Sequence, residues 1–165
     1  MRTAWPNRLL PRARSLARNH AVTLTIRTHR LDADVVDSGA VHRVRIDLPI
    51  WPEKTQTDAG RLIARARAVT RGLGPGDLPD ALDAEFRQHG IRVAVALDQQ
   101  TAACDCRSRR RPCVHVLATV YALTQLIDER PVLTIELRSS RAEVAEPTGA
   151  GWIALSDLDP AGLYG

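Results

Sequence analysis

All three cysteines of the chain fall in one short segment, and a histidine stands two positions after the last of them. Cys104, Cys106, Cys113 and His115 form the pattern Cys-x-Cys, six residues, Cys-x-His. Three thiolates and one neutral imidazole are the four donors that a tetrahedral zinc ion accepts, and they leave no coordination position open for a substrate. Clustered cysteine and histidine at this spacing indicate metal binding. The segment therefore predicts one structural Zn²⁺ site.

Three alternatives to a metal site are a chance grouping of the thiols, a redox Cys-x-Cys pair, and an enzyme that uses Cys104 or Cys106 as its nucleophile. A nucleophilic cysteine has to be exposed, of low pKa and close to a base. A thiolate bound to a metal lacks that freedom. The histidine after Cys113, and the helix expected to begin there, favour the metal over these alternatives. We therefore expect a chain that is not an enzyme.

The loop between the two donor pairs is rich in arginine, at Arg107, Arg109, Arg110 and Arg111. A metal would hold both ends of this loop, so the entropy cost of presenting the arginines to phosphates would already be met in the folded state. We expect this loop to contact a nucleic acid, DNA or RNA, or a protein partner. In the alternative hypothesis the arginines only balance the anionic site, and the chain is a protein–protein adaptor without nucleic-acid contact.

A helix is expected to position the second donor pair. Pro112 suits a helix entrance because it has no backbone N–H to leave unsatisfied. Cys113 would then lie at the cap and His115 in the first turn, where the partial positive charge of a helix N-terminus favours a thiolate. The apolar residues that follow recur every three or four positions, at Val116, Val120, Leu123 and Ile127.

The four donor positions resemble those of the SWIM zinc finger, whose signature is Cys-x-Cys, a variable gap and Cys-x-His. The resemblance to bacterial members covers about residues 12–138 and includes Gly76–Leu82 and Asp128–Leu133. Arg107 and Val114 stand where many bacterial members have proline and lysine, but neither position ligates metal. The resemblance implies binding of DNA or proteins and an association with helicases of the SNF2 type.

The remaining histidines (His20, His29, His42 and His89) are isolated in the sequence, and we expect none of them to ligate the metal. Asp105, between two donors, is expected to face solvent or to pair with an arginine of the loop.

Composition and charge place the chain among globular proteins with a core of their own, since 44% of the residues are hydrophobic. The net charge of +4 is unevenly distributed: residues 1–31 contain arginines and no acid, whereas residues 142–165 contain acids and no base. A basic arm can reach phosphates, although a solvated surface is the more common meaning of such a charge run.

No apolar stretch approaches the roughly 18 residues needed to cross a bilayer, and the run Leu9-Leu10 is too short for a secretory signal. We expect a cytoplasmic protein without a membrane partner. The cysteines would persist there as thiols or metal ligands rather than as disulfides.

The periodicities predict an α+β fold. Apolar and polar residues alternate over 22–26, 31–35 and 44–48, which is typical of a three-stranded antiparallel β-meander. Helical spacing follows in two segments, one capped by Thr57 or Asp58 and one that starts at Asp77-Leu78-Pro79 and stops at Gly90.

Two further alternating segments flank the finger. Residues 91–97 predict a strand that leads into the cysteines, and residues 133–137 predict a last strand, where the family resemblance would allow a helix instead.

The predicted organisation has four parts. They are a basic N-terminal arm or short helix at 1–19, an α+β region at 20–100, the zinc finger with its helix and strand at 101–138, and an acidic, partly mobile tail at 139–165.

Overall fold

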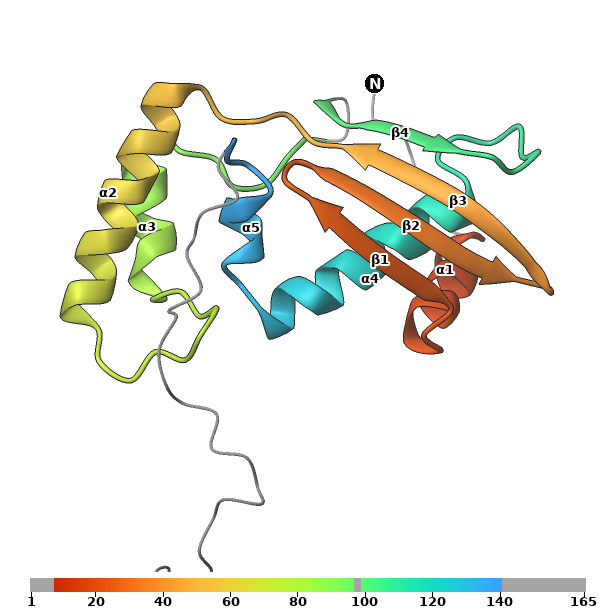
Figure 1. Cartoon of the computed structure of the whole chain (residues 1–165), viewed down its shortest axis with the longest axis horizontal. Coiled ribbons are helices and arrows are strands. Elements are labelled where there is room, and N and C mark those ends of the chain that lie inside the picture. Colours follow the sequence, from red (N-terminus) through yellow and green to blue (C-terminus); the bar gives the residue numbers. More distant parts are fainter. Residues whose placement is uncertain (1–7, 97–98, 141–165) are drawn as a thin grey trace, which may run out of the picture.

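The computed structural model of the chain describes residues 8–96 and 99–140 (Figure 1). These residues form an α+β structure, as the sequence predicts. The strands are β1 (Val22–Arg27), β2 (Arg30–Asp37), β3 (Ala40–Asp47) and β4 (Thr101–Cys104). The helices are α1 (Leu10–Arg18), α2 (Glu53–Val69), α3 (Ala81–Gln88), α4 (Val114–Glu129) and α5 (Leu133–Glu136). Most of the predicted acidic tail lies outside the described residues.

The predicted β-meander is present and forms most of a four-stranded antiparallel sheet, in the order β1-β2-β3-β4. The turn between β2 and β3 contains Ser38 and Gly39, whose φ angles of 52° and 81° are the left-handed values that a tight hairpin needs. β4 pairs with β3 at the far edge, where Cys104 lies opposite Val44. The sheet therefore delivers the first predicted metal donor from its edge strand.

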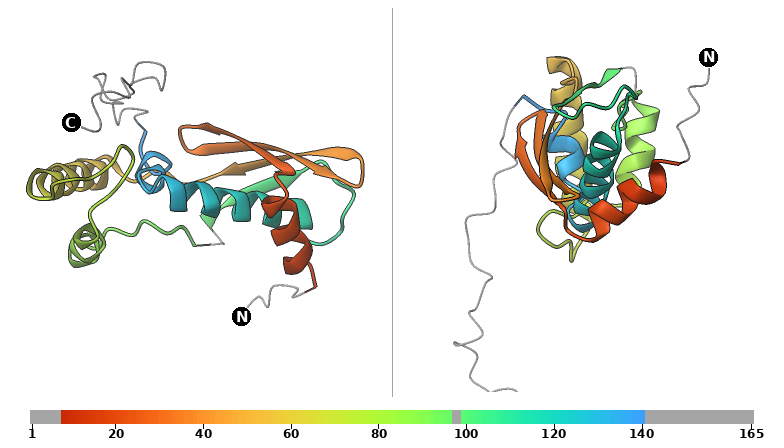
Figure 2. Two further views of the ribbon diagram at one scale, coloured as in Figure 1. Left: turned by 90° about the horizontal axis from the view of Figure 1, so that it is seen from below. Right: turned by 90° about the vertical axis from the view of Figure 1, so that its right-hand side faces the viewer.

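One face of the sheet is covered by α4 and α1, which pack against each other (Figure 2). Alternation along β2 and β3 directs every second side chain toward these helices. The buried residues of this first cluster include Leu31, Ala33, Val35, Val44 and Ile46 of the sheet and Val116, Leu117 and Ala118 of α4.

The opposite face of the sheet is polar. Arg45 pairs with Asp32 at 3.0 Å and Arg30 with Asp47 at 2.7 Å, each across the β2–β3 register. Such exposed pairs contribute about 0–1 kcal/mol each, so the buried face supplies most of the stability.

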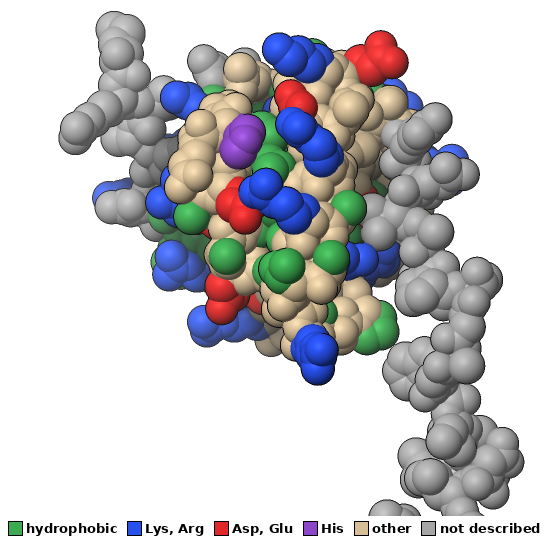
Figure 3. Space-filling model, turned by 90° about the vertical axis from the view of Figure 1, so that its left-hand side faces the viewer, with side chains coloured by type: hydrophobic (Ala, Val, Ile, Leu, Met, Phe, Trp, Pro, Cys, Tyr) green, Lys and Arg blue, Asp and Glu red, His purple; other side chains and the backbone are tan. Residues whose placement is uncertain are grey.

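A second hydrophobic cluster lies between α2, α3 and the segments around them. Trp51 packs edge-to-face on Phe86, with 6.2 Å between ring centroids, and donates its indole N–H to the carbonyl of Arg92 at 3.0 Å. Figure 3 views this end of the molecule, where basic and acidic side chains lie interspersed. Arg61 pairs with Asp58 and Arg65 with Glu85, as expected of a solvated face.

The predicted strand at 91–97 is wrong for residues 91–96, which are irregular. Their alternation has another cause: Ile91 and Val93 pack into the second cluster, and Val95 lines a cavity beside α4. The strand that leads into the cysteines is instead the short β4, which has β3 as its partner.

The predicted strand at 133–137 is also wrong, because these residues form the short helix α5 and its end. Successive helical residues are rotated by about 100°, so residues two apart point in nearly opposite directions. Ile135 packs into the second cluster and Leu137 into the first. A short helix between two hydrophobic clusters can therefore have the same apolar alternation in its sequence as a strand.

Three helix starts also need correction or refinement. α2 begins at Glu53, directly after Pro52, and not at Thr57 or Asp58. α3 begins at Ala81, after the predicted start. The basic N-terminal segment forms α1 over Leu10–Arg18, whose Ala13 and Ala17 are buried.

Among the described residues, no helix is both long and apolar enough to cross a bilayer.

Substitutions of two neighbouring valines of β2 test which face of the sheet contributes more to the free energy of unfolding. Val35 is 0% exposed and Val36 is 50% exposed. We expect Val35→Ala to lower the free energy of unfolding by about 2 kcal/mol, from lost burial and the cavity left behind. Val36→Ala should cost less than about 0.5 kcal/mol. Urea unfolding of both variants measures the difference, and equal losses would contradict the assignment of the two faces.

Candidate metal centre

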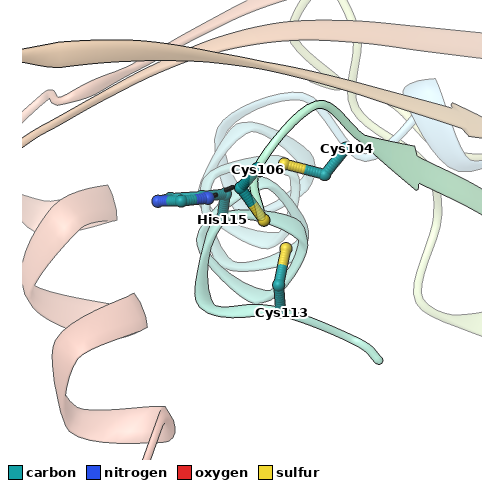
Figure 4. Close-up of side chains that lie close together, drawn as sticks. All are labelled: Cys104, Cys106, Cys113 and His115. Carbon is teal, nitrogen blue, oxygen red and sulfur yellow. Dashed lines mark hydrogen bonds between the residues drawn. The ribbon is translucent and has the colours of Figure 1, made fainter. Parts of the chain in front are cut away.

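Two elements bring the four predicted donors together (Figure 4). Cys104 ends β4 and Cys106 follows it in the turn, whereas Cys113 is the N-cap of α4 and His115 lies in its first turn. One donor atom from each residue lies within 4.8 Å of all the others. The helix starts where Pro112 predicts it. The structure thus places the four side chains in one cluster, as the spacing predicts.

The geometry fits a tetrahedral ion. Zn–S and Zn–N bonds of about 2.3 and 2.0–2.1 Å place a sulfur and a nitrogen about 3.5 Å apart around such an ion. Cys104 Sγ lies 3.6 Å from Nδ1 of His115. Three sulfurs and one imidazole nitrogen suit a borderline-soft metal, and the donor set points to zinc.

All three thiols can be deprotonated at the same time only when a cation balances their charge. Burial raises the pKa of Cys104 to about 12. Burial also acts to raise the pKa of Cys106, but the backbone N–H of Ser108, the neighbouring thiols and the charge of Arg111 outweigh it, so that this pKa is lowered. One thiolate is therefore favoured and further ones are opposed, until a divalent ion supplies the balancing charge.

The imidazole of His115 is held from its far side by a carboxylate. Nδ1 faces the cysteines, so the proton resides on Nε2, which donates to Asp37 Oδ2 at 3.2 Å. Burial lowers the pKa of His115, and the opposing effect of Asp37 does not reverse this shift. A neutral imidazole with a carboxylate on its second nitrogen is the arrangement found around metal-bound histidines in proteins.

Asp37 is in turn held by α1. The Arg12 guanidinium donates to its carboxylate at 2.7 Å and holds the pKa of Asp37 below its ordinary value. The Asp37 side chain is only 12% exposed. The chain of contacts Arg12–Asp37–His115 therefore links α1, the β2–β3 hairpin and the first turn of α4.

His42 and Asp105 complete the surroundings of the cluster. His42 stacks on His115, with 4.0 Å between ring centroids, and is not one of the four clustered donors. Asp105 faces solvent, the first of the two predicted alternatives, with its side chain 52% exposed and its carboxylate 3.5 Å from Nδ1 of His42. The ring of His42, on β3, therefore covers one face of the His115 imidazole.

Sequence reasoning missed Asp37, Arg12 and His42, although a signal for two of them exists. Asp37 has the same parity along β2 as the buried Leu31, Ala33 and Val35, and His42 has the parity of Val44 and Ile46. Polar residues that share the parity of a buried face must find partners inside. No comparable pattern marks Arg12.

The arginines of the loop lie outside the cluster and are exposed. Arg111 folds back on the loop and donates to the carbonyls of Ser108 and Arg110 at 2.5 and 3.2 Å. Within residues 8–96 and 99–140, none of Arg107, Arg109, Arg110 and Arg111 forms an ion pair.

Comparison with known proteins agrees with this geometry. Residues 92–123 match the model of the SWIM zinc finger family, and this segment contains all four donors. The chain is 26% identical over 137 residues to the uncharacterized protein Rv2102 of Mycobacterium tuberculosis. The match covers 81% of this chain and 50% of that protein, so the chain spans about half the length of this relative. No solved structure matches the chain.

The role of Asp37 can be tested with a matched pair of variants. We expect Asp37→Asn to weaken zinc binding by about 10–100-fold, because a neutral amide no longer orients the imidazole or balances its developing charge. Asp34→Asn, on the exposed face of the same strand, should leave the affinity unchanged. Competition with a chromophoric chelator measures both, and equal affinities would show that Asp37 does not support the site.

Proposed function

We propose, from the SWIM-type finger at its centre, that this chain is a non-enzymatic zinc-binding module whose arginine loop contacts nucleic acid. One zinc ion would be held by Cys104, Cys106, Cys113 and His115 in a structural role. The observation that carries the proposal is the Cys₃His cluster itself, whose donor atoms all lie within 4.8 Å of one another.

A structural role follows from the full set of donors. Four protein ligands satisfy a tetrahedral zinc ion, whereas catalytic sites keep one position for water or substrate. The two donor pairs come from β4, at the edge of the sheet, and from the N-terminus of α4. Bound zinc would supply a crosslink between these two elements and fix both ends of the loop between them.

The proposal that the chain is not an enzyme is supported by the contacts of its cysteines and of His115, which leave none of them free to act as nucleophile or base. All three cysteines take part in the cluster. His115, the nearest base, is occupied on both nitrogens by the thiol side and by Asp37. A thiolate nucleophile would need to leave this arrangement before it could attack.

Nucleic-acid contact is supported by the concentration of four arginines within residues 107–111. Elsewhere some arginines pair with carboxylates (Arg12, Arg30, Arg45, Arg61, Arg65, Arg87 and Arg130), and others, such as Arg27 and Arg71, do not within residues 8–96 and 99–140. Those of the loop are exposed and form no ion pair in the described part of the chain. Unpaired guanidinium groups on a pinned loop suit phosphate oxygens, which they can bind in bidentate fashion.

Protein binding is the second candidate function. Val36 and Val41 face each other across the β2–β3 register near the hairpin turn and are 50% and 58% exposed. A protein partner would find an apolar contact at this pair of valines, on an otherwise polar face. From the family resemblance, a helicase of the SNF2 type is the partner to test first.

Zinc binding predicts a defined metal content. We expect about one zinc per purified chain by plasma mass spectrometry. His115→Gln should weaken zinc binding by more than the roughly 10–100-fold typical of an outer-shell change, since it removes a ligand. The control is the variant His89→Gln, at an exposed histidine outside the cluster, which should bind zinc with the affinity of the unmodified chain. A metal-free wild-type chain that keeps its melting temperature in chelator would contradict the proposal.

Phosphate contact predicts a change in salt dependence. Replacing Arg109 and Arg110 by alanine should reduce the slope of log affinity against log salt concentration by about 2, because two counterion-releasing contacts are lost. The control replaces Arg27 and Arg71, which are exposed and form no ion pair in the described residues. It removes the same charge outside the loop and should leave the slope unchanged. Fluorescence anisotropy with single- and double-stranded DNA and RNA measures both variants. Equal slopes would favour the protein adaptor instead.

A further inference from the structure

A groove of about 750 Å³ runs between α4, the irregular segment 91–96 and the end of the sheet. The left view of Figure 2 shows this segment running alongside α4. Apolar side chains form most of the lining, among them Leu31, Ile46, Val95, Val120, Leu123 and Ile127. The volume is in the range of clefts that hold a ligand or a peptide segment. The groove lies away from the metal cluster, and none of the four donors lines it.

A buried arginine also lines this groove. Arg138 is only 9% exposed, and its guanidinium carbon lies 5.5 Å from the centroid of the Trp51 ring. Within the described residues, neither its Nε nor its Nη1 has a hydrogen-bond partner. Burial lowers the pKa of Arg138. An arginine stays protonated even then, so a positive charge with two unsatisfied donors remains at the groove.

The rim of the groove carries further positive charge. Arg87 and Arg92 line it and are exposed. Arg87 is paired with Asp83, whereas Arg92 has no carboxylate partner in the described part of the chain. The groove therefore suits an occupant that combines apolar side chains with carboxylates.

One segment of the chain itself has this chemistry. The sequence Trp152-Ile153-Ala154-Leu155-Ser156-Asp157-Leu158-Asp159 contains four large apolar residues and two acids, and no base occurs between Ala142 and Gly165. Ser140, the last described residue, follows Arg138 by two positions. The connection of eleven residues from 141 to 151 can span up to about 36 Å, which is ample to return to the groove.

We propose that residues 152–159 dock in this groove, with Leu155 and Leu158 against its apolar wall and Asp157 or Asp159 neutralising Arg138 and Arg92. The contact covers the half-buried apolar side chains of α4 that line the groove and places a carboxylate near the guanidinium of Arg138. It is a function for the acidic end of the chain that depends neither on zinc nor on nucleic acid.

Hydrogen exchange measured by mass spectrometry on the zinc-loaded chain of residues 1–165 tests this docking. We expect residues 152–159 to exchange at least about tenfold more slowly than a synthetic peptide of residues 141–165 measured alongside. The double variant Leu155→Ser, Leu158→Ser should bring their exchange to the peptide rate and also speed the exchange of residues 91–96. Its matched control is Val144→Ser, Leu163→Ser, which should retain the protection.

The charge contribution has its own pair of variants. Asp157→Asn, Asp159→Asn should speed the exchange of residues 152–159 several-fold, whereas Glu143→Gln, Glu146→Gln should not. Exchange of 152–159 at the peptide rate in the unmodified chain would overturn the proposal. Protection that grows with protein concentration would also overturn it, because the groove would then bind a second copy.

Discussion

The convergence of two donor pairs from different elements is the constraint on which the rest of the molecule depends. Cys104 and Cys106 continue the edge strand β4, and Cys113 and His115 begin α4. β4 has only four residues and pairs with β3 alone. Because the cysteines also pack against the first hydrophobic cluster, a crosslink at this point ties the sheet edge, the helix and the core together.

The surroundings of the cluster extend this constraint to the N-terminal helix. Asp37 lies between the imidazole of His115 and the guanidinium of Arg12, at 3.2 and 2.7 Å. The carboxylate thus balances the charge of Arg12 and holds the imidazole in the tautomer that frees Nδ1 for a metal. α1 packs against α4 over the same region, so the orientation of the metal donor and the position of the helix support each other.

The two hydrophobic clusters are joined by the short α5 and the residues after it. Ile135 faces one cluster and Leu137 the other, while Arg138 lies over Trp51 and its carbonyl accepts the backbone N–H of Trp51 at 2.8 Å. A buried charge at this junction is costly unless it has a partner. The docking proposed above would give this charge a carboxylate partner, whereas the donors of the metal cluster already face one another.

The sequence by itself determined the donor set, the β-meander and the start of α4, because each depends on spacing or periodicity within one contiguous segment. It did not reveal that Asp37 meets His115, 78 residues away, since such contacts depend on which faces pack together. The alternations at 91–96 and 133–137 were misleading for the same reason. A period of two shows only that every second side chain is buried, and the tertiary structure decides whether a sheet partner or separate hydrophobic clusters bury them.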